Sequence, residues 1–321
     1  MRQLLQYRPW KGDLHSPWWS VWPIARVALG KLLTRRLFWV LYAFGLLLFL
    51  MFFFGSFLLS WAEAQMVVSG EQLGRLGDPA RMFRLVRAGL RILNGSQETF
   101  QYFFAYQGGI VVVTLALAGS LLVGNDFASK SLPFYLAKPI SRWHYLLGKM
   151  LAVFVVVQMM TTLPAIVLYG QHAFDDFNYF LNVDYFIGNE TGKGPAGVVL
   201  LLSIIGYGTL LSVFLSILLV ATASWMRTTM PLIMVWVSLF FFLRLLANLL
   251  VDGMKLDPHW RLLDLWNDLT LLGQGCLGFA HESIKPAPQP EFWAAGLVLT
   301  GVCIGCLIYL NHRTRSVEIV S

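Results

Sequence analysis

Six long runs of apolar residues, each about as long as a membrane is thick, dominate the pattern of this chain. They occupy residues 37–61, 102–123, 147–170, 198–223, 231–251 and 292–310. A helix of about 20 apolar residues crosses a hydrocarbon core of about 30 Å. Inside a bilayer every backbone N–H and C=O must be bonded within the protein, and a helix meets that need. The pattern therefore predicts an all-α, polytopic membrane protein with six transmembrane helices.

No linker and no internal repeat separates these runs, which favours one membrane domain with soluble tails and loops. We expect a cytoplasmic tail and interfacial helix at 1–36, a transmembrane domain at 37–311 and a second cytoplasmic tail at 312–321. Composition agrees, because hydrophobic residues make up 57% of the chain, charged residues make up 13% and the mean hydropathy is +0.64. A soluble protein of this length needs far more polar surface.

The distribution of Lys and Arg predicts which side of the membrane each loop faces. Fourteen of these residues fall in the two tails, the loop 125–149 and the turn at Arg227. The other loops contain more acidic than basic residues. Cytoplasmic loops are enriched in Lys and Arg, so both termini are expected in the cytoplasm. Basic loops facing anionic lipid account for the net charge of +7, and no nucleic-acid partner is expected.

Three stretches outside the spans also have helical or membrane-seeking patterns. Residues 18–36 combine tryptophans with Lys and Arg, which is typical of a helix lying in the membrane interface. In the first outer loop, 79–94 carries arginines on one helical face and apolar residues on the other, which predicts an amphipathic outer helix. The last outer loop, 252–291, is rich in Leu and Trp, so we expect it to lie along the outer leaflet or to dip into it. A dipping segment would have to be buried against protein.

Motifs for catalysis or metal binding are incomplete. The stretch 188–194 resembles a phosphate-binding loop. It has one residue too few between its glycines, and no Ser or Thr follows Lys193. His281-Glu282 lacks the second histidine of a zinc-protease helix. The sequence therefore predicts that this chain is not an enzyme and binds neither a cofactor nor a metal ion.

Polar residues within the spans are the next clue to function. Arg244, Asn248 and Asp252 recur every four residues and so share one stripe of the fifth span. A charge at the bilayer centre costs about 2.5–3.5 kcal/mol, so it usually faces protein or water. Arg244 either pairs with Asp252 or lipid headgroups, or it lines a substrate path together with Asn248 and Asp252.

The third span carries its own polar positions. Gln158, Thr161 and Thr162 precede Pro164, which removes a backbone donor and softens the helix. Such residues face the helix bundle more often than lipid, so Gln158 and Thr161 are further candidates for a substrate path.

The loop between the second and third spans carries the most specific motif. Asp126 is followed by Leu132, then by Pro139-Ile140-Ser141-Arg142 and by Leu147-Gly148-Lys149. This order resembles the cytosolic loop of ABC type-2 transporter permeases, although Lys130 and Ser131 stand where that family has Gly-Thr. Pro139 ends one helix and Ser141 is placed to cap the next.

The resemblance implies a membrane subunit energised by a separate cytosolic ABC ATPase dimer that binds ATP and Mg²⁺. It also implies a second permease copy or paralogue and, usually, export. An aromatic anchor ringed by charge is a suitable docking surface, which the chain would form from eight loop residues: Phe134, Tyr135, Leu136, Lys138, Pro139, Ile140, Ser141 and Arg142.

Three functions remain open from the sequence. The first is an exporter of a lipid-like or amphipathic substrate in the cell membrane, which the family resemblance places in a bacterium. The second is an ATPase-coupled subunit for cofactor maturation or envelope signalling. The third is a stand-alone channel or intramembrane enzyme. Membrane lipid is an expected contact in all three.

Overall fold

The computed structural model describes residues 17–69, 93, 95–124, 141–175, 197–226, 228–281, 284 and 288–318. No strand occurs among them. The main helices, in chain order, are α1 (Val21–Leu33), α2 (Arg36–Ser69), α4 (Gln97–Gly119), α7 (Arg142–Met160), α8 (Thr162–Asp175), α10 (Gly197–Met226), α11 (Thr229–Val237), α12 (Leu243–Asn248), α13 (Leu265–Cys276) and α14 (Phe292–Glu318). The all-α prediction is confirmed.

Short helical pieces connect or extend these elements. They are the 3₁₀ helices η1 (Pro17–Ser20) and η7 (Pro258–Leu263), and the π-helical turns η3 (Ser120–Gly124), η5 (Ser238–Phe242) and η6 (Leu249–Gly253). The turn η3 extends α4, and η5 and η6 make α11 and α12 part of one continuous span.

All six predicted spans are present among the described residues as helices of membrane-crossing length and hydropathy. Their bounds are Arg36–Gly55, Gln97–Gly124, Arg142–Ala173, Gly197–Met226, Thr229–Gly253 and Phe292–Arg313. Most are longer than the apolar runs because polar and aromatic residues at the ends of a run continue the same helix.

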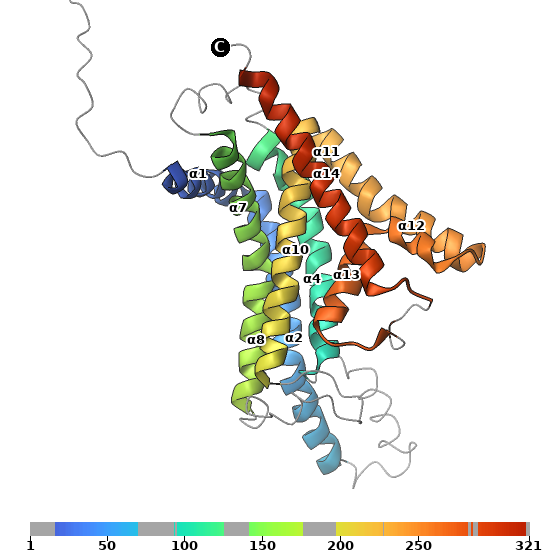
Figure 1. The fold of residues 1–321 in the computed structure, drawn as a ribbon. Coiled ribbons are helices and arrows are strands. Elements are labelled where there is room, and N and C mark those ends of the chain that lie inside the picture. The colour runs from blue at the N-terminus through green and yellow to red at the C-terminus, as the bar shows by residue number, and fades with distance from the viewer. Residues whose placement is uncertain are drawn as a thin grey trace, which may run out of the picture.

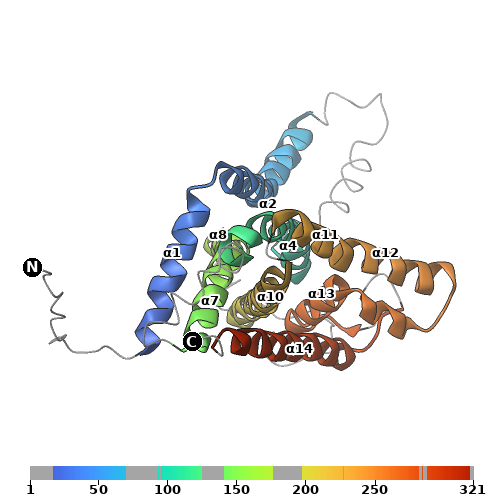
Figure 2. The same cartoon turned by 90° about the horizontal axis from the view of Figure 1, so that it is seen from above.

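The spans form a bundle with α10 at its centre. α10 contacts α4, α7, α8, α13 and α14, and Figure 2 shows it between α7 and α14. It is apolar all round because one side contacts these helices and the other exposes residues such as Leu202 and Val213, which a membrane span can leave to lipid. α2, α4, α7, α8 and α10 run side by side, whereas α11–α12 and α14 lean away (Figure 1). We call the end of the bundle near α1 the junction end and the opposite end the far end.

The helix α1 lies across the bundle at the junction end rather than along it (Figure 1). It packs on α7 through Ala25, Ala28 and Leu32, which recur on one face and are buried. Trp19 in η1 and Trp22 in the first turn of α1 are exposed. Small residues toward protein and tryptophans away from it match the predicted interfacial helix.

The last loop does dip into the bundle, as the short helix α13. Twelve residues are too few to span a membrane, and α13 packs against α4, α10 and α14 instead. A Cβ added at Gly108 of α4 would come within 2.4 Å of the Trp266 ring, and one added at Gly273 within 2.1 Å of Tyr207. The dipping segment is therefore buried against protein, as predicted.

One predicted element and one further sequence motif remain to be placed. The predicted amphipathic helix at 79–94 falls almost entirely outside the described residues. The spacing Gly301-x-x-x-Gly305 is typical of close helix contacts. Both glycines are exposed, and a Cβ added at either position would meet nothing within 4 Å. This pair therefore makes no helix contact within the described part of the chain.

Candidate functional sites

The first candidate site is the junction end, where the loop with the family motif enters the third span. Phe134, Tyr135, Leu136, Lys138, Pro139 and Ile140 lie outside the described residues. Ser141 is extended and exposed, and Arg142 begins α7. The Ser141 Oγ lies 2.5 Å from Nδ1 of His144 rather than on a backbone N–H. Ser141 thus stabilises the first turn of α7 through an imidazole, which corrects the expectation of a side-chain cap on the backbone.

Lys149 connects the two ends of this loop. Its side chain is buried, and Nζ donates a 2.8 Å hydrogen bond to the carbonyl oxygen of Leu122 in η3. A helix leaves its last carbonyls without partners, and a cation is favoured there. The ammonium also lies 5.7 Å from the centre of the Tyr145 ring. The end of the second span and the start of the third are therefore bonded directly.

Gly148 brings a third element to the same point. A Cβ at this position would lie 2.8 Å from Ile24 and 3.0 Å from the carbonyl oxygen of Val21, both in α1. Trp18 also packs edge-on against His144, with ring centroids 4.8 Å apart. The Leu-Gly-Lys motif therefore places α1, η3 and α7 in contact.

The third span is broken near its middle, as Pro164 led us to expect. Thr161 separates α7 from α8 with φ −114° and ψ −66°, and its Oγ1 donates to the carbonyl oxygen of Val157 at 2.8 Å. Pro164 has no N–H to give to the carbonyl of Met160. Nε2 of Gln107, from α4, supplies that hydrogen bond at 2.7 Å. An amide from a neighbouring span thus compensates for the proline.

Gln158 and Thr161 both make contacts within the bundle, and their role in a substrate path stays a prediction. Gln158 Nε2 lies 3.4 Å from Oγ1 of Thr209 on α10, and Thr161 is fully buried. Beside them, Thr162 sits directly against Gly208, where an added Cβ would come within 1.9 Å of its Oγ1. These polar groups are used for helix packing within the described chain.

The second candidate site lies around α12 and α13. Arg244 Nε is 3.9 Å from Oδ2 of Asp264, and Nη2 of Arg261 donates to Oδ1 of Asp252 at 2.7 Å. The expected pairing of Arg244 with Asp252 is therefore wrong. The turn through η7 brings Arg261 and Asp264 back beside α12, and a spacing rule within one helix cannot foresee that.

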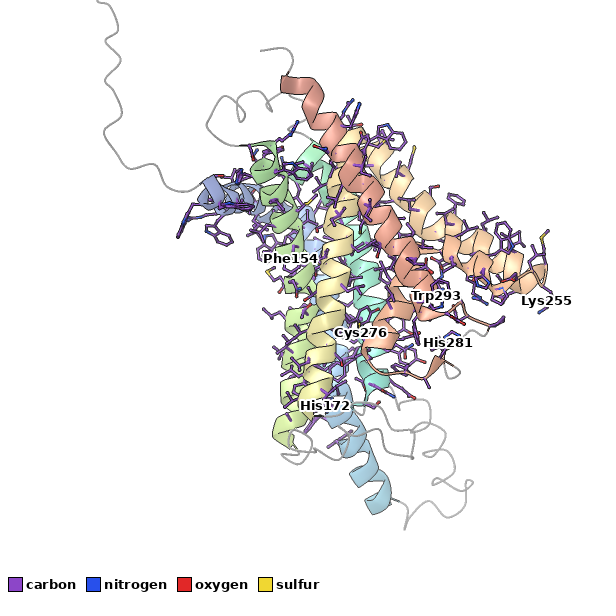
Figure 3. All side chains as sticks on the ribbon, viewed as in Figure 1. Phe154, His172, Lys255, Cys276, His281 and Trp293 are labelled. Carbon is purple, nitrogen blue, oxygen red and sulfur yellow. The ribbon has the colours of Figure 1, made fainter. Side chains whose placement is uncertain are left out.

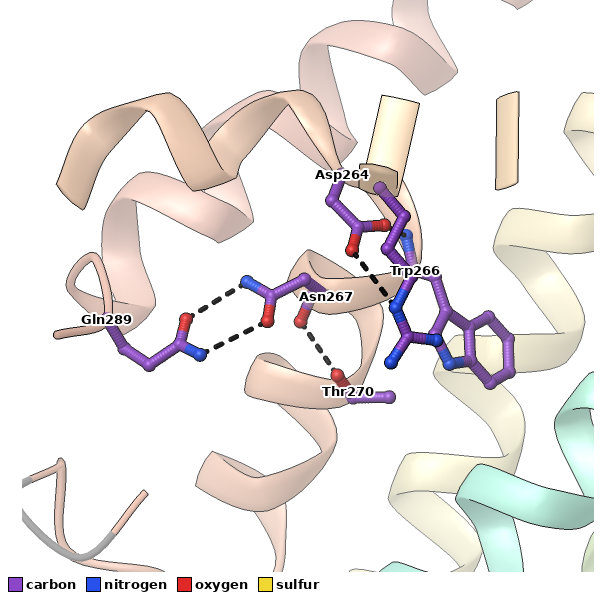
Figure 4. Close-up of polar contacts among 6 residues, drawn as sticks. Asp264, Trp266, Asn267, Thr270 and Gln289 are labelled. Carbon is purple, nitrogen blue, oxygen red and sulfur yellow. Dashed lines mark hydrogen bonds and ion pairs between the residues drawn. The ribbon is translucent and has the colours of Figure 1, made fainter. Parts of the chain in front are cut away.

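The acids of this network are more buried than its outer arginine. Asp264 caps α13 by accepting from the backbone N–H of Trp266 at 3.0 Å (Figure 4). Burial raises the pKa of Asp264 despite the nearby guanidinium groups. Asp268 is fully buried without a hydrogen-bond partner for either oxygen among the described residues. Burial, with a smaller effect of Asp264, raises the pKa of Asp268 to about 8.

A reciprocal amide pair holds α13 from its other side. Asn267 and Gln289 exchange two hydrogen bonds of 3.0 and 3.2 Å, and Thr270 donates to the Asn267 carbonyl (Figure 4). Gln289 precedes α14, so the pair connects α13 to the last span. The network is thus fixed from two directions, although Arg244 itself is exposed.

The two sets of predicted path residues do not meet. Phe154 on the third span and Lys255 beyond the fifth lie on opposite sides of the bundle (Figure 3). The two sets therefore belong to different spans, Gln158 and Thr161 to the third and Arg244 and Asp252 to the fifth. Asn248 is exposed beside Arg244. Sequence analysis missed Gln107, Arg261 and Asp264. A lone amide in an apolar run was a visible signal for Gln107, but nothing in the sequence placed the other two.

Comparison with known families supports the resemblance seen in the loop. The model of the ABC-2 family transporter protein matches residues 22–260, about three quarters of the chain. That range includes all but the first residue of α1, the first five spans and the first half of the 3₁₀ helix η7. No relative is found among curated proteins. The match, the motif at the junction end and the six-span bundle agree, and the chain belongs to the ABC-2 transporter family as a multi-pass membrane permease.

Proposed function

We propose that this chain is the membrane subunit of an ATP-driven exporter of an amphipathic substrate. A separate cytosolic ABC ATPase would dock on loop 125–149 and hydrolyse ATP with its own Mg²⁺. The junction end would face the cytosol, and a second permease copy or a paralogue would complete the transporter. Family membership supports the transport role, and the Lys and Arg distribution supports the orientation.

The bond between Lys149 and the Leu122 carbonyl is the observation that carries the proposal. An ATPase that moves the loop must move both spans it connects, and this bond makes them move together. Gly148 adds α1 to the same unit. Small shifts at such a contact are transmitted because packed helices move as rigid bodies.

Docking is tested by exchanging loop residues. The triple change Tyr135→Ala, Leu136→Ala and Arg142→Glu should weaken copurification of the host ATPase at least about thirtyfold, because truncating an interface anchor commonly costs at least about 2 kcal/mol. Lys255→Glu is the matched control. It reverses a charge just beyond the end of the fifth span that lies away from loop 125–149, so ATPase binding should be unchanged. Full ATPase binding by the triple variant, at equal membrane levels, would exclude loop 125–149 as the docking site.

Coupling is tested separately through Lys149. Lys149→Met keeps an unbranched side chain one atom shorter but loses the bond to Leu122. We expect ATPase binding to stay within about twofold while ATP-dependent transport in vesicles falls at least about tenfold. A Lys149→Met protein that transports at the normal rate would show that the bond only stabilises the fold.

A further inference from the structure

Arg244 lies deep along the bundle rather than at its end. Trp266, two residues after Asp264, reaches Gly108, which is eleven residues or about 16 Å from the far end of α4. Trp266 also packs edge-on against Phe240, with ring centroids 6.3 Å apart. Arg244 follows Phe240 by one helical turn and approaches Asp264. Its guanidinium is therefore near the level of the middle of α4.

The charge of Arg244 is poorly compensated at this depth. Its side chain is 58% exposed, and its nearest carboxylate oxygen among the described residues is 3.9 Å away, on Asp264. The alternative acid, Asp252, is bonded to Arg261 at 2.7 Å. Arg261 is buried and its Nε has no partner among those residues. Arg261 and Asp252 therefore neutralise each other, and the distant Asp264 carboxylate is the partner left for Arg244.

The surface around Arg244 is apolar in both directions along the span. Met234, Phe241 and Leu245 are between 58% and 71% exposed. Asn248, one turn further on, adds an exposed amide. A guanidinium with five donors matches a phosphate or carboxylate group, and its apolar neighbours match alkyl chains. A ligand with only one of these two parts would leave the other part of the surface uncovered.

We propose that Arg244 binds the anionic group of an amphiphile whose alkyl chains lie along the exposed side of α11 and α12. An exposed arginine within a span needs an anion or water, and only a molecule that is both charged and apolar satisfies the whole surface. The anion belongs to a phosphodiester or carboxylate headgroup. The inference rests on the proposed function in one respect only, namely that the bound amphiphile is the cargo.

Binding is tested on the purified full chain, without any ATPase. Native mass spectrometry would compare retention of phosphatidylglycerol and phosphatidylcholine with identical acyl chains. The wild-type chain should prefer the anionic lipid, and Arg244→Gln should weaken its binding at least about tenfold. Arg244→Lys keeps the charge but loses the planar guanidinium that can donate two parallel hydrogen bonds, so it should bind with intermediate affinity. Arg26→Gln, at an exposed arginine of α1, is the control and should stay within about twofold.

Other outcomes would overturn the proposal. Equal retention of both lipids would exclude an anion site, and displacement by soluble glycerol phosphate at equal concentration would exclude a role for the alkyl chains. If Arg244→Gln dissociates an oligomer while lipid binding is unchanged, Arg244 serves contact between copies. Arg244→Lys keeps the test valid if Arg244→Gln does not fold. Lipid binding without ATP-dependent transport would refute the exporter function while leaving the site intact.

Discussion

The third and fifth spans both contain polar groups, but they use them in opposite ways. In the third span, half of the most apolar 18-residue stretch is buried inside the described structure. In the fifth span, only 17% of the corresponding stretch is buried. Gln107 bonds to the third span at its break, and Thr161 bonds within its own helix. On the fifth span, Arg244 is exposed and held only loosely by Asp264.

This difference separates polar residues that build the bundle from those that are available to a ligand or partner. A buried polar group must be bonded, and in the third span the main-chain carbonyl at the break is bonded. An exposed charge in a span is not accounted for by hydrogen bonds inside the bundle. Changes in the third span should therefore lower stability, whereas changes at Arg244 should alter binding with little effect on the fold.

The largest effect is expected where the third span touches α10. Gly208→Ala would place a Cβ 1.9 Å from Oγ1 of Thr162 and should cost about 1–3 kcal/mol of unfolding free energy. Gly206→Ala, on the same helix with nothing within 4 Å, should instead be neutral or stabilise by up to about 1 kcal/mol. Thermal unfolding in detergent measures both. Equal melting temperatures for the two variants would contradict the close packing.

A comparable loss is expected at the break itself. Gln107→Leu should cost about 1–3 kcal/mol because the Met160 carbonyl loses its donor. Pro164→Ala restores a backbone N–H four residues after Met160, so the same Gln107→Leu change should cost less than half as much in that background. A double-mutant cycle from unfolding curves measures this coupling. Additive losses would show that Gln107 does not compensate for the proline.

The sequence predicted the six spans, the interfacial helix and the dipping loop, because each depends on hydrophobicity over a window of residues. It also identified Pro164 and its polar neighbours as a softened segment. It did not predict that Gln107 would bond at that break, or that Arg261 and Asp264 would return beside Arg244. Those contacts join residues far apart in the chain, and hydrophobic periodicity contains no information about which helices are neighbours.

A smaller effect should appear in the pH dependence of the fifth-span side. Asp268 has a pKa of about 8 in the fold, against an ordinary value of 3.8. The folded chain therefore keeps a proton that the unfolded chain releases, so stability falls as pH rises from about 4 to 8. We expect a loss of about 1 kcal/mol between pH 6 and 8. Asp268→Asn should flatten the dependence of the melting temperature on pH between pH 6 and 8. If the variant keeps the pH dependence of the wild type, Asp268 is already ionised in the fold.

The smallest effect on stability is expected at Arg244. Arg244→Gln removes an exposed charge with one ion pair of 3.9 Å, so the unfolding free energy should change by less than about 1 kcal/mol. Chemical denaturation in detergent is the measurement. A loss as large as that of Gln107→Leu would place Arg244 among the residues that build the bundle and remove the contrast between the two spans.

The helix α13 also implies an order of assembly during synthesis. Its two docking surfaces, at Gly108 and Tyr207, precede it in the chain, whereas Gln289 and α14 follow it. With only twelve residues, α13 is too short to be inserted as a span of its own and must enter sideways, between helices already in the membrane. Asn267 of α13 can form its amide pair only after Gln289 has been synthesised. A nascent chain stopped before that residue would have α4 and α10 in place but would lack both the amide pair and α14, the third helix against which α13 packs.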